Sequence, residues 1–237
     1  MNIARILSGV CQRLMAAAYR CAPQDTYILM LHEVTADAPP QHPDISITRE
    51  NLEKLLEQME KNGIATVPVS AIHEPADCRR AVLTFDDIFA NACENAFPLL
   101  RQKGIPYTVF ITTEYVDKPG FVTSAQLETL KQDPLCTIGF HANTHVLMRE
   151  LDNARIRENT DPKAFEEAYG VKCDYFAFPY GSVYACPRRA VKIAGKQGYR
   201  AVFSTVSAGT SAARIRRNAR FVPRLCVSNR SWNSVLD

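Results

Sequence analysis

Short apolar runs alternate with amphipathic stretches along most of the chain. The runs predict buried strands, and they lie at residues 27–31, 65–68, 81–85, 107–111, 137–140, 176–178 and 200–205. Between the first two runs, apolar residues recur three and four apart, after an N-cap at Thr48 and before a stop at Gly63. Strands that alternate with helices predict a predominantly parallel sheet, open or closed, in one α/β domain.

Three local signals divide the helical stretches. Pro98 predicts a kink or a restart in the helix that follows the strand at 81–85. Residues 123–126 have the form of a capping box and predict the start of another helix. The pair Asp161-Pro162 predicts a break in a charged helical region over residues 150–169.

Residues 1–24 are interpreted as an amphipathic helix packed on a domain that spans residues 25–237. Apolar residues recur at helical spacing with arginines between them, and docking on the domain is the commoner use of such a stripe. The alternative is a peripheral contact with the inner face of a membrane. Because Arg13 interrupts the stretch, we expect neither a membrane span nor a secretory signal, and we expect a cytoplasmic protein or one at that inner face.

The composition adds few constraints. The 237 residues are 46% hydrophobic and 22% charged, which is ordinary for a soluble globular protein. A net charge of +3 is too mild to indicate a nucleic-acid partner. The eight cysteines form no C-x-x-C pair, so we expect them to be reduced.

Polar side chains stand at the ends of several predicted strands. The candidates are His32, Asp86, Asp87, His141 and Tyr180. Loops at the carboxyl ends of parallel strands converge on one mouth, so these residues are expected to meet there. The adjacent carboxylates Asp86 and Asp87 repel each other unless a cation favours both charges. We expect one of them to bind a metal and the other to stay free; the alternative is a turn or N-cap acid.

A pair of histidines strengthens the expectation of a metal. His141 and His145 are separated by three residues, a spacing that places both imidazoles on one side of a helical or tightly turned segment. Two histidines and one aspartate, with open positions left for water and substrate, are typical of a catalytic divalent metal site. Taken alone the pair is equally compatible with surface or core histidines. Zinc is the expected metal, and cobalt, nickel or manganese would also suit this ligand set.

Three segments together resemble the polysaccharide deacetylase family, also called the NodB-homology family. They are Thr84-Phe85-Asp86-Asp87, the run Gly139-Phe140-His141-Ala142-Asn143-Thr144-His145, and Phe176-Ala177-Phe178-Pro179-Tyr180-Gly181. The resemblance covers residues 27–227 and implies a distorted (β/α) barrel with about seven strands. It also implies metal-dependent removal of acetyl groups from N-acetylated sugars. By position, Asp87, His141 and His145 would be the metal ligands and Asp86 the general base.

Two further roles follow from the reaction and the resemblance. Amide hydrolysis needs an oxyanion stabiliser, which the backbone N–H of Tyr180 would share with the metal, although a simple proline turn is the alternative. It also needs an acid for the leaving amine. No histidine follows His145. Leu31-His32-Glu33-Val34 resembles the early histidine of a permuted branch, represented by poly-N-acetylglucosamine deacetylases, which makes His32 the candidate acid; the alternative is a structural histidine.

The sequence departs from the family pattern at three positions. Ile88 replaces a usual glycine, Ala142 a usual serine or threonine, and Ala177 an arginine that orients the base in many members. Ile88 would narrow the substrate pocket or mark a weakened activity. Arg224, in a strand-like apolar segment, is a candidate to pair with Asp86 in place of the missing arginine.

These observations predict a metal-dependent carbohydrate N-deacetylase that acts on an N-acetylated sugar or glycan precursor. The alternatives are a deformylase or amidase with the same site, acting on a non-polymeric substrate, and a catalytically weak member that binds a glycan. The basic run Arg214–Arg220 would either hold the phosphate of a linked sugar or form a solvated, disordered loop, and the loop is slightly favoured.

Overall fold

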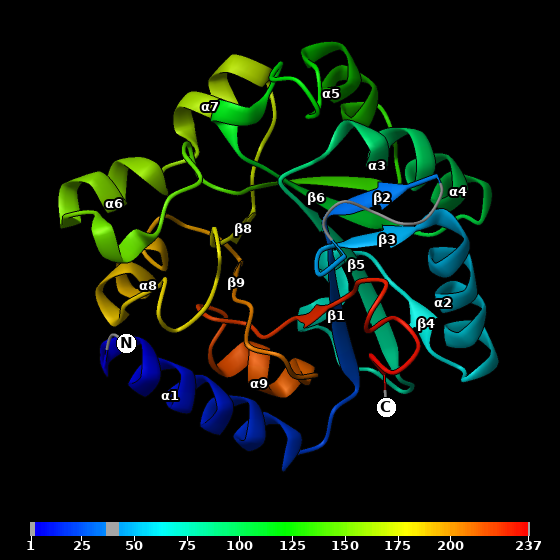
Figure 1. Cartoon of the computed structure of the whole chain (residues 1–237), viewed down its shortest axis with the longest axis horizontal. Helices are drawn as coiled ribbons and strands as arrows, with labels where there is room; N and C mark the ends of the chain where they lie inside the picture. The colour runs from blue at the N-terminus through cyan, green and yellow to red at the C-terminus, as the bar shows by residue number, and fades with distance from the viewer. Residues whose placement is uncertain (1–2, 37–42, 237) are drawn as a thin grey trace.

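The computed structural model describes residues 3–36 and 43–236, and their centre is one curled parallel sheet (Figure 1). Its strands follow the order β10-β1-β5-β6-β7-β8-β9, with β4 paired beside β5. Their bounds are β1 Thr26–Leu31, β4 Ala65–Thr66, β5 Arg80–Asp86, β6 Tyr107–Ile111, β7 Cys136–Phe140, β8 Tyr175–Ala177, β9 Ala201–Phe203 and β10 Leu225–Cys226. This architecture confirms the predicted distorted (β/α) barrel of about seven strands.

The two edges of the sheet approach each other through the chain segment that leads into β10. Val222 forms a parallel bridge with Phe203 of β9, and Leu225 pairs with Leu29 of β1. This short segment therefore connects β9, at one edge of the sheet, with β1 near the other edge. Arg224 lies in this segment and is fully buried.

Alternation along the strands divides the apolar side chains between two clusters. Leu83 and Phe85 of β5 belong to a large cluster that includes helix residues, whereas Val82 belongs to a smaller cluster on the other face of the sheet. Thr84 and Asp86 follow Val82 at the strand period of two, so they share its face. A buried carboxylate on that face requires a partner with the opposite charge.

Helices surround the sheet (Figure 1). They are α1 Ile3–Arg20, α2 Arg49–Lys61, α3 Ala90–Asn95, α4 Phe97–Gln102, α5 Ser124–Lys131, α6 Asn153–Asn159, α7 Lys163–Tyr169, α8 Arg188–Ala194 and α9 Ala212–Arg217, with short 3-10 turns η1 Val69–His73, η2 Thr113–Tyr115 and η3 Met148–Glu150. Pro98 lies in the first turn of α4, where the helix restarts after α3. Thr123 and Gln126 form the capping box of α5, and Asp161-Pro162 lies between α6 and α7. All three local signals are confirmed.

Two segments differ from the sequence prediction. Residues 33–35 and 46–48, for which the sequence analysis predicted no strand, form a two-stranded parallel sheet of β2 Glu33–Thr35 and β3 Ser46–Thr48, while residues 37–42 lie outside the described residues. The loop expected at Arg214–Arg220 is wrong over residues 214–217, which belong to helix α9. The side chain of Ile215 is buried on α9, and this burial anchors the helix on the domain.

Two arginines of this run donate hydrogen bonds to backbone carbonyls of neighbouring elements. Arg214 donates to the carbonyl of Ala18 in α1 at 3.0 Å and Arg216 to the carbonyl of His73 in η1 at 2.7 Å. The run therefore links α1 and η1 to the barrel.

Helix α1 lies along the outside of the barrel beside α8 and α9 (Figure 1). The side chain of Gln12 donates to the carbonyl of Thr205 at 3.2 Å and accepts from the backbone N–H of Val183 at 3.0 Å. Among the described residues, no helix combines the length and the apolar character that a transmembrane span requires.

Candidate metal and catalytic site

Strand register brings the candidate residues to one end of the barrel. Leu31 pairs with Phe85. His32 and Asp86 are the next residues along these two neighbouring strands, so they lie side by side. Asp86 in turn pairs with Phe110 of β6. Ile111 of β6 then pairs with Phe140, the residue before His141. The carboxyl ends of adjacent parallel strands therefore place these side chains around a common centre.

Asp87, His141 and His145 form a compact group of possible metal ligands. Asp87 Oδ1 lies 3.5 Å from His141 Nε2 and 3.3 Å from His145 Nε2, and one ligand atom from each residue lies within 4.8 Å of the other two. Ligand atoms of a tetrahedral zinc site with bonds of about 2.0–2.2 Å are separated by about 3.3–3.6 Å. The spacing of the carboxylate oxygen from both imidazoles fits a metal ion between the three groups.

The environment of Asp87 supports the same fit. Its Oδ1 atom is buried and forms no hydrogen bond with any described residue. Burial, followed by the charge of Asp86, raises the pKa of Asp87 to about 7. A bound cation would favour the charged carboxylate and satisfy the unpaired oxygen. The site thus has the electrostatic character of one built around a positive ion.

The orientation of His141 also suits a metal ligand. Its Nδ1 lies 2.7 Å from the carbonyl of Ala177 on β8, which accepts a hydrogen bond when Nδ1 carries the proton. This tautomer leaves the lone pair of Nε2 directed at Asp87. Burial lowers the pKa of His141 to about 3, so the imidazole is neutral near pH 7, as a metal ligand must be.

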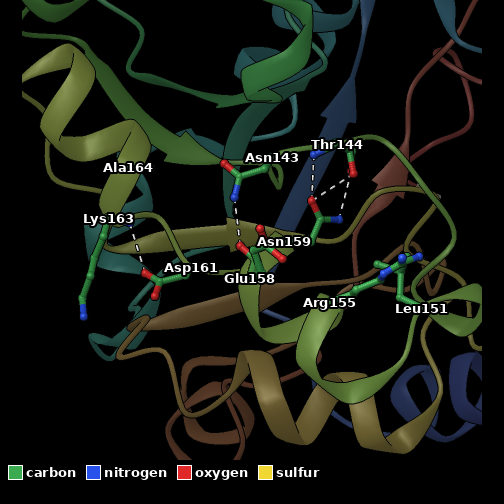
Figure 2. Close-up of a pocket in the computed structure, with 9 residues that line it drawn as sticks. All are labelled: Asn143, Thr144, Leu151, Arg155, Glu158, Asn159, Asp161, Lys163 and Ala164. Atoms are coloured by element: carbon green, nitrogen blue, oxygen red, sulfur yellow. Dashed lines mark hydrogen bonds between the residues drawn. The ribbon is translucent and has the colours of Figure 1, made fainter.

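The second histidine stands on a loop that two other side chains hold in place. Glu114 accepts a hydrogen bond from the backbone N–H of His145 at 2.5 Å. Asn159, at the end of α6, accepts from the backbone N–H of Thr144 at 2.7 Å and donates to its carbonyl at 3.1 Å (Figure 2). Asn143 and Thr144 also line a pocket of about 560 Å³ with residues of α6 and α7. These contacts fix the backbone from which His145 projects.

Replacing Asn159 with leucine is expected to weaken metal binding. The buried amide holds both polar groups of the Thr144 peptide, and loss of such an outer contact typically lowers metal affinity about 10–100-fold. The metal dissociation constant is measured by competition with a chelator, and the cobalt-loaded spectrum reports the ligand geometry. Asn153→Ala is the control on the same helix, because among the described residues the Asn153 side chain hydrogen-bonds to Arg189 at 3.1 Å and not to the metal-site loop. A loss of stability with unchanged metal affinity and spectrum would leave Asn159 a purely structural role.

Asp86 is held by Arg224 in a bidentate ion pair. Arg224 donates from one terminal nitrogen to Oδ1 at 2.7 Å and from the other to Oδ2 at 2.6 Å. It also donates hydrogen bonds to the carbonyl of Ser204 at 3.1 Å and to the hydroxyl of Thr84 at 3.2 Å. Burial, the largest single influence, would raise the pKa of Asp86, but the charge and hydrogen bonds of Arg224 together with the charges of His141 and His32 outweigh it and hold that pKa down at about 2. Arg224 thus occupies the place that the sequence analysis assigned to it.

His32 stands next to this ion pair. It is half-buried, and its Nδ1 atom has no hydrogen-bond partner among the described residues. Burial lowers the pKa of His32 to about 4, although the charge of Asp86 opposes the shift. The side chain is therefore a neutral imidazole with one unpaired nitrogen, and it is close enough to Asp86 for the charge of that carboxylate to act on it.

Tyr180 lies at the open side of the site. Its ring is 53% exposed and contacts the ring of His145 at a centroid distance of 4.6 Å. Its carbonyl accepts a hydrogen bond from the Thr205 hydroxyl at 2.9 Å, whereas no described residue accepts from its backbone N–H. That N–H remains available to a ligand.

Backbone strain accompanies these side chains. Asp87, Ile88, Ala142 and Tyr180 have positive φ angles of 62°, 50°, 77° and 58°. Non-glycine residues in this region cost about 1–3 kcal/mol each and tend to occur at functional sites. The side chain of Ile88 is fully buried in the large apolar cluster. It therefore does not line an open pocket. This differs from the expectation in the sequence analysis that Ile88 would narrow the substrate pocket.

The sequence analysis did not identify Glu114 and Asn159 as residues of the site. Neither belongs to a recognisable short motif, and Asn159 contacts the metal-site loop across fifteen residues of sequence. The only available signal for Asn159 was a polar residue close to the helix break at Asp161-Pro162, which does not distinguish a loop anchor from a surface amide.

Comparison with known proteins relates this site to one family. A family profile described as polysaccharide deacetylase matches residues 73–202. No curated protein matches the sequence at a significant level.

Solved structures share the fold. IcaB from Ammonifex degensii is 23% identical with a TM-score of 0.74, over 90% of this chain and 96% of that chain. The deacetylase PplD from Streptococcus pyogenes, solved in complex with acetate, is 18% identical with a TM-score of 0.75, over 91% and 98%. A de-N-acetylase from Aggregatibacter actinomycetemcomitans is 17% identical with a TM-score of 0.69, over 87% and 96%.

Proposed function

Because the chain belongs to the polysaccharide deacetylase family, we propose that it is a metal-dependent hydrolase that removes the N-acetyl group from an amino sugar in a glycan or glycan precursor. The observation that carries the proposal is the convergence of Asp87, His141 and His145 beside the Asp86–Arg224 ion pair. These five side chains provide a metal-ligand group and an oriented carboxylate at one end of the barrel.

Asp87, His141 and His145 would hold the metal, and zinc is the metal that this donor set favours. When bound, the metal polarises the acetyl carbonyl and lowers the pKa of water. All other steps fall to side chains and backbone groups of the chain.

Asp86 would accept a proton from the attacking water. Arg224 occupies both of its oxygens from one side, which fixes the plane of the carboxylate. A carboxylate oxygen has a second lone-pair direction, and Oδ2 lies 3.9 Å from His141 Nε2, so it borders the ligand group. The arginine keeps Asp86 ionised and in one orientation before the substrate arrives.

His32 would deliver a proton to the leaving amine. A neutral imidazole has one N–H donor and one acceptor nitrogen, and the unpaired Nδ1 of His32 provides one of these next to Asp86. Asp86 would pass the proton taken from the water to the acceptor nitrogen of His32, while the N–H of the same imidazole would protonate the amine nitrogen as the C–N bond breaks. The products are acetate and the free amino sugar, and the free N–H of Tyr180 would stabilise the oxyanion that precedes them.

The surroundings of the site suit a sugar. Tyr115 stacks on Phe121 at 4.3 Å and contacts His145 at 5.7 Å, and Tyr180 also contacts His145, at 4.6 Å. Half-exposed aromatic rings beside a few oriented polar groups are typical of small-molecule sites. An N-acetylhexosamine presents both an apolar ring face and an amide to such a surface.

The proposal is tested by measuring acyl release from a panel of amino sugars. The panel contains N-acetylhexosamines as monomers, as oligomers and in nucleotide-linked form, with the N-formyl analogues as competitors. We expect acetate release that requires both the metal and Asp86, with no release by Asp86→Asn. Preferential formate release would show that the enzyme is a deformylase instead of a deacetylase. Metal binding without release from any substrate would overturn the hydrolase in favour of a glycan-binding protein.

A further inference from the structure

The exposed apolar side chains of the protein are concentrated on one helix. Among the described residues, the large hydrophobic side chains with high exposure are Ile6 at 43%, Leu7 at 64%, Val10 at 42% and Leu14 at 66%, together with Tyr180 at the catalytic site. The first four all belong to α1. Their positions recur three, four and seven residues apart, so they form one stripe along the helix. We refer to these four residues as the α1 stripe.

The opposite side of α1 is the side that contacts the barrel. Gln12 bonds to two barrel loops, Ala16 is buried, and the ring of Tyr19 lies 4.8 Å from the guanidinium of Arg214. With 3.6 residues per turn, these residues face away from Leu7, Val10 and Leu14. The α1 stripe is therefore a second apolar face on a helix whose first face is already docked.

The net positive charge of the protein comes from the segment that contains the same helix. The whole chain has 28 basic and 25 acidic residues, a net charge of +3. Residues 1–24 contain Arg5, Arg13 and Arg20 and no acidic residue, so the remaining chain has 25 basic and 25 acidic residues and is neutral. Arg5 and Arg13 are exposed, and the described residues include no acidic partner for either. Arg13, seven residues after Ile6, borders the stripe, whereas Arg5, seven residues before Gln12, lies on the same side of α1 as Gln12. An exposed apolar stripe with an unpaired cation at its border is complementary to an anionic, partly apolar surface.

A groove beside α1 extends this positive surface. It lies between α1 and α8, with Leu7 and Met15 on one wall and Val191 and Phe221 on the other. Arg149, Arg188, Lys192 and Arg220 also line it, and no acidic residue does. Figure 1 shows α1 running along the outer edge of the molecule next to α8. The cations of α8 thus add to those of α1 around one apolar strip.

We propose that the α1 stripe binds the surface of an anionic lipid bilayer, with Leu7 and Leu14 in the interfacial region and the arginines against the lipid headgroups. An amphipathic helix with a basic polar side binds membranes in this way, through apolar burial and attraction to anionic lipids together. The helix does not need to leave the barrel, because Gln12 and Ala16 stay docked while the stripe inserts.

The docked helix connects this surface to the catalytic site. Gln12 donates to the carbonyl of Thr205, whose hydroxyl donates to the carbonyl of Tyr180. The helix that would hold the bilayer is therefore in direct contact, through its docked side, with the loop at the open side of the site. This arrangement would present membrane-associated glycan to the enzyme, a consequence that rests on the proposed function, whereas the membrane binding itself does not.

The test is co-sedimentation of the full chain with vesicles. Vesicles of phosphatidylcholine alone are compared with vesicles that also contain phosphatidylglycerol. We expect binding to the anionic vesicles, weakened by added salt, and little binding to the neutral ones. In the variant Leu7→Gln/Leu14→Gln, the partition coefficient on anionic vesicles should fall by about tenfold or more, because two apolar contacts are lost. The variant Arg5→Gln/Arg13→Gln should weaken binding and reduce its dependence on salt.

Matched controls separate this result from general charge and folding effects. Lys61→Gln/Lys103→Gln removes the same charge from exposed positions outside α1 and should leave vesicle binding unchanged. Circular dichroism and acetate release from a soluble substrate should be the same for all variants. The proposal is overturned if the parent chain ignores anionic vesicles or if the leucine variant binds them equally well. It is also overturned if the stripe instead mediates a dimer that the leucine substitutions dissociate in light scattering.

Discussion

Replacing Asp87 with asparagine is expected to abolish metal binding and to reduce acetate release by about 10³-fold or more. The carboxylate provides the anionic ligand between two neutral histidines, and an asparagine of the same shape removes its charge. Metal content of the purified variant and turnover at saturating metal measure the effect. Asp174→Asn is the control, because Asp174 contacts Lys172 at 2.7 Å and no ligand.

The same substitution should change stability in a characteristic direction. In the metal-free protein, Asp87 is a buried acid with an unpaired oxygen beside a second carboxylate. Its removal should stabilise the metal-free fold, by about 1 kcal/mol, while abolishing the further stabilisation that metal gives the parent protein. Thermal unfolding with and without metal measures both effects. Metal-induced stabilisation that survives in Asp87→Asn would contradict the assigned ligand set.

Of the single substitutions proposed, Arg224→Met is expected to cause the largest loss of stability. Arg224 is fully buried and forms both hydrogen bonds of its ion pair with Asp86. Methionine would leave a buried carboxylate without its partner, which typically destabilises a protein by about 3–5 kcal/mol. Urea unfolding measures the loss. Acetate release per folded molecule should also fall, because Asp86 loses the contact that fixes its orientation.

A second buried arginine and a double variant make this prediction specific. Arg80 is also buried, but its side chain donates only to neutral oxygens, among them the Thr26 hydroxyl at 3.0 Å. Arg80→Met should therefore destabilise less than Arg224→Met. Adding Asp86→Asn to Arg224→Met should recover part of the lost stability, because the unpaired charge is gone. If the changes in the free energy of unfolding caused by the two substitutions simply add in the double variant, the ion pair does not hold the site together.

The sequence predicted the parts of the structure that local patterns specify. Each apolar run became a strand of one parallel sheet, and Pro98 and the Thr123 capping box marked helix boundaries where the structure has them. His32, Asp86 and His141 were found because each follows a buried strand, and parallel register then carries such residues to the same end of the barrel. Proximity of the candidate residues could therefore be predicted without knowledge of side-chain contacts.

Long-range contacts were harder to predict. Arg224 was a candidate partner of Asp86 because a charged residue stood in an apolar segment, but the reason for the pairing is the closure of the barrel by the segment from Val222 to β10. That strand has only two residues and gives no periodic signal. Similarly, α9 was missed because its basic residues resemble a solvated run, whereas burial of Ile215 anchors it.

Strained backbone at the site was also beyond the reach of local rules. Ile88 adopts a positive φ that β-branched residues avoid, and the sequence analysis connected it with the substrate pocket. In the structure the Ile88 side chain is buried in the core, and its carbonyl accepts a hydrogen bond from Val122 at 3.0 Å. Core burial and this contact compensate for a conformation that the residue alone would not favour.

The most direct test of the central claim is acetate release during the return of metal to chelator-treated protein. We predict that release from an N-acetylhexosamine oligomer rises in proportion to added zinc, saturates at one ion per chain and is absent in Asp86→Asn at the same metal content. Release that is indifferent to the chelator and to metal would contradict the account, because Asp87, His141 and His145 would then be an arrangement without a role in the reaction.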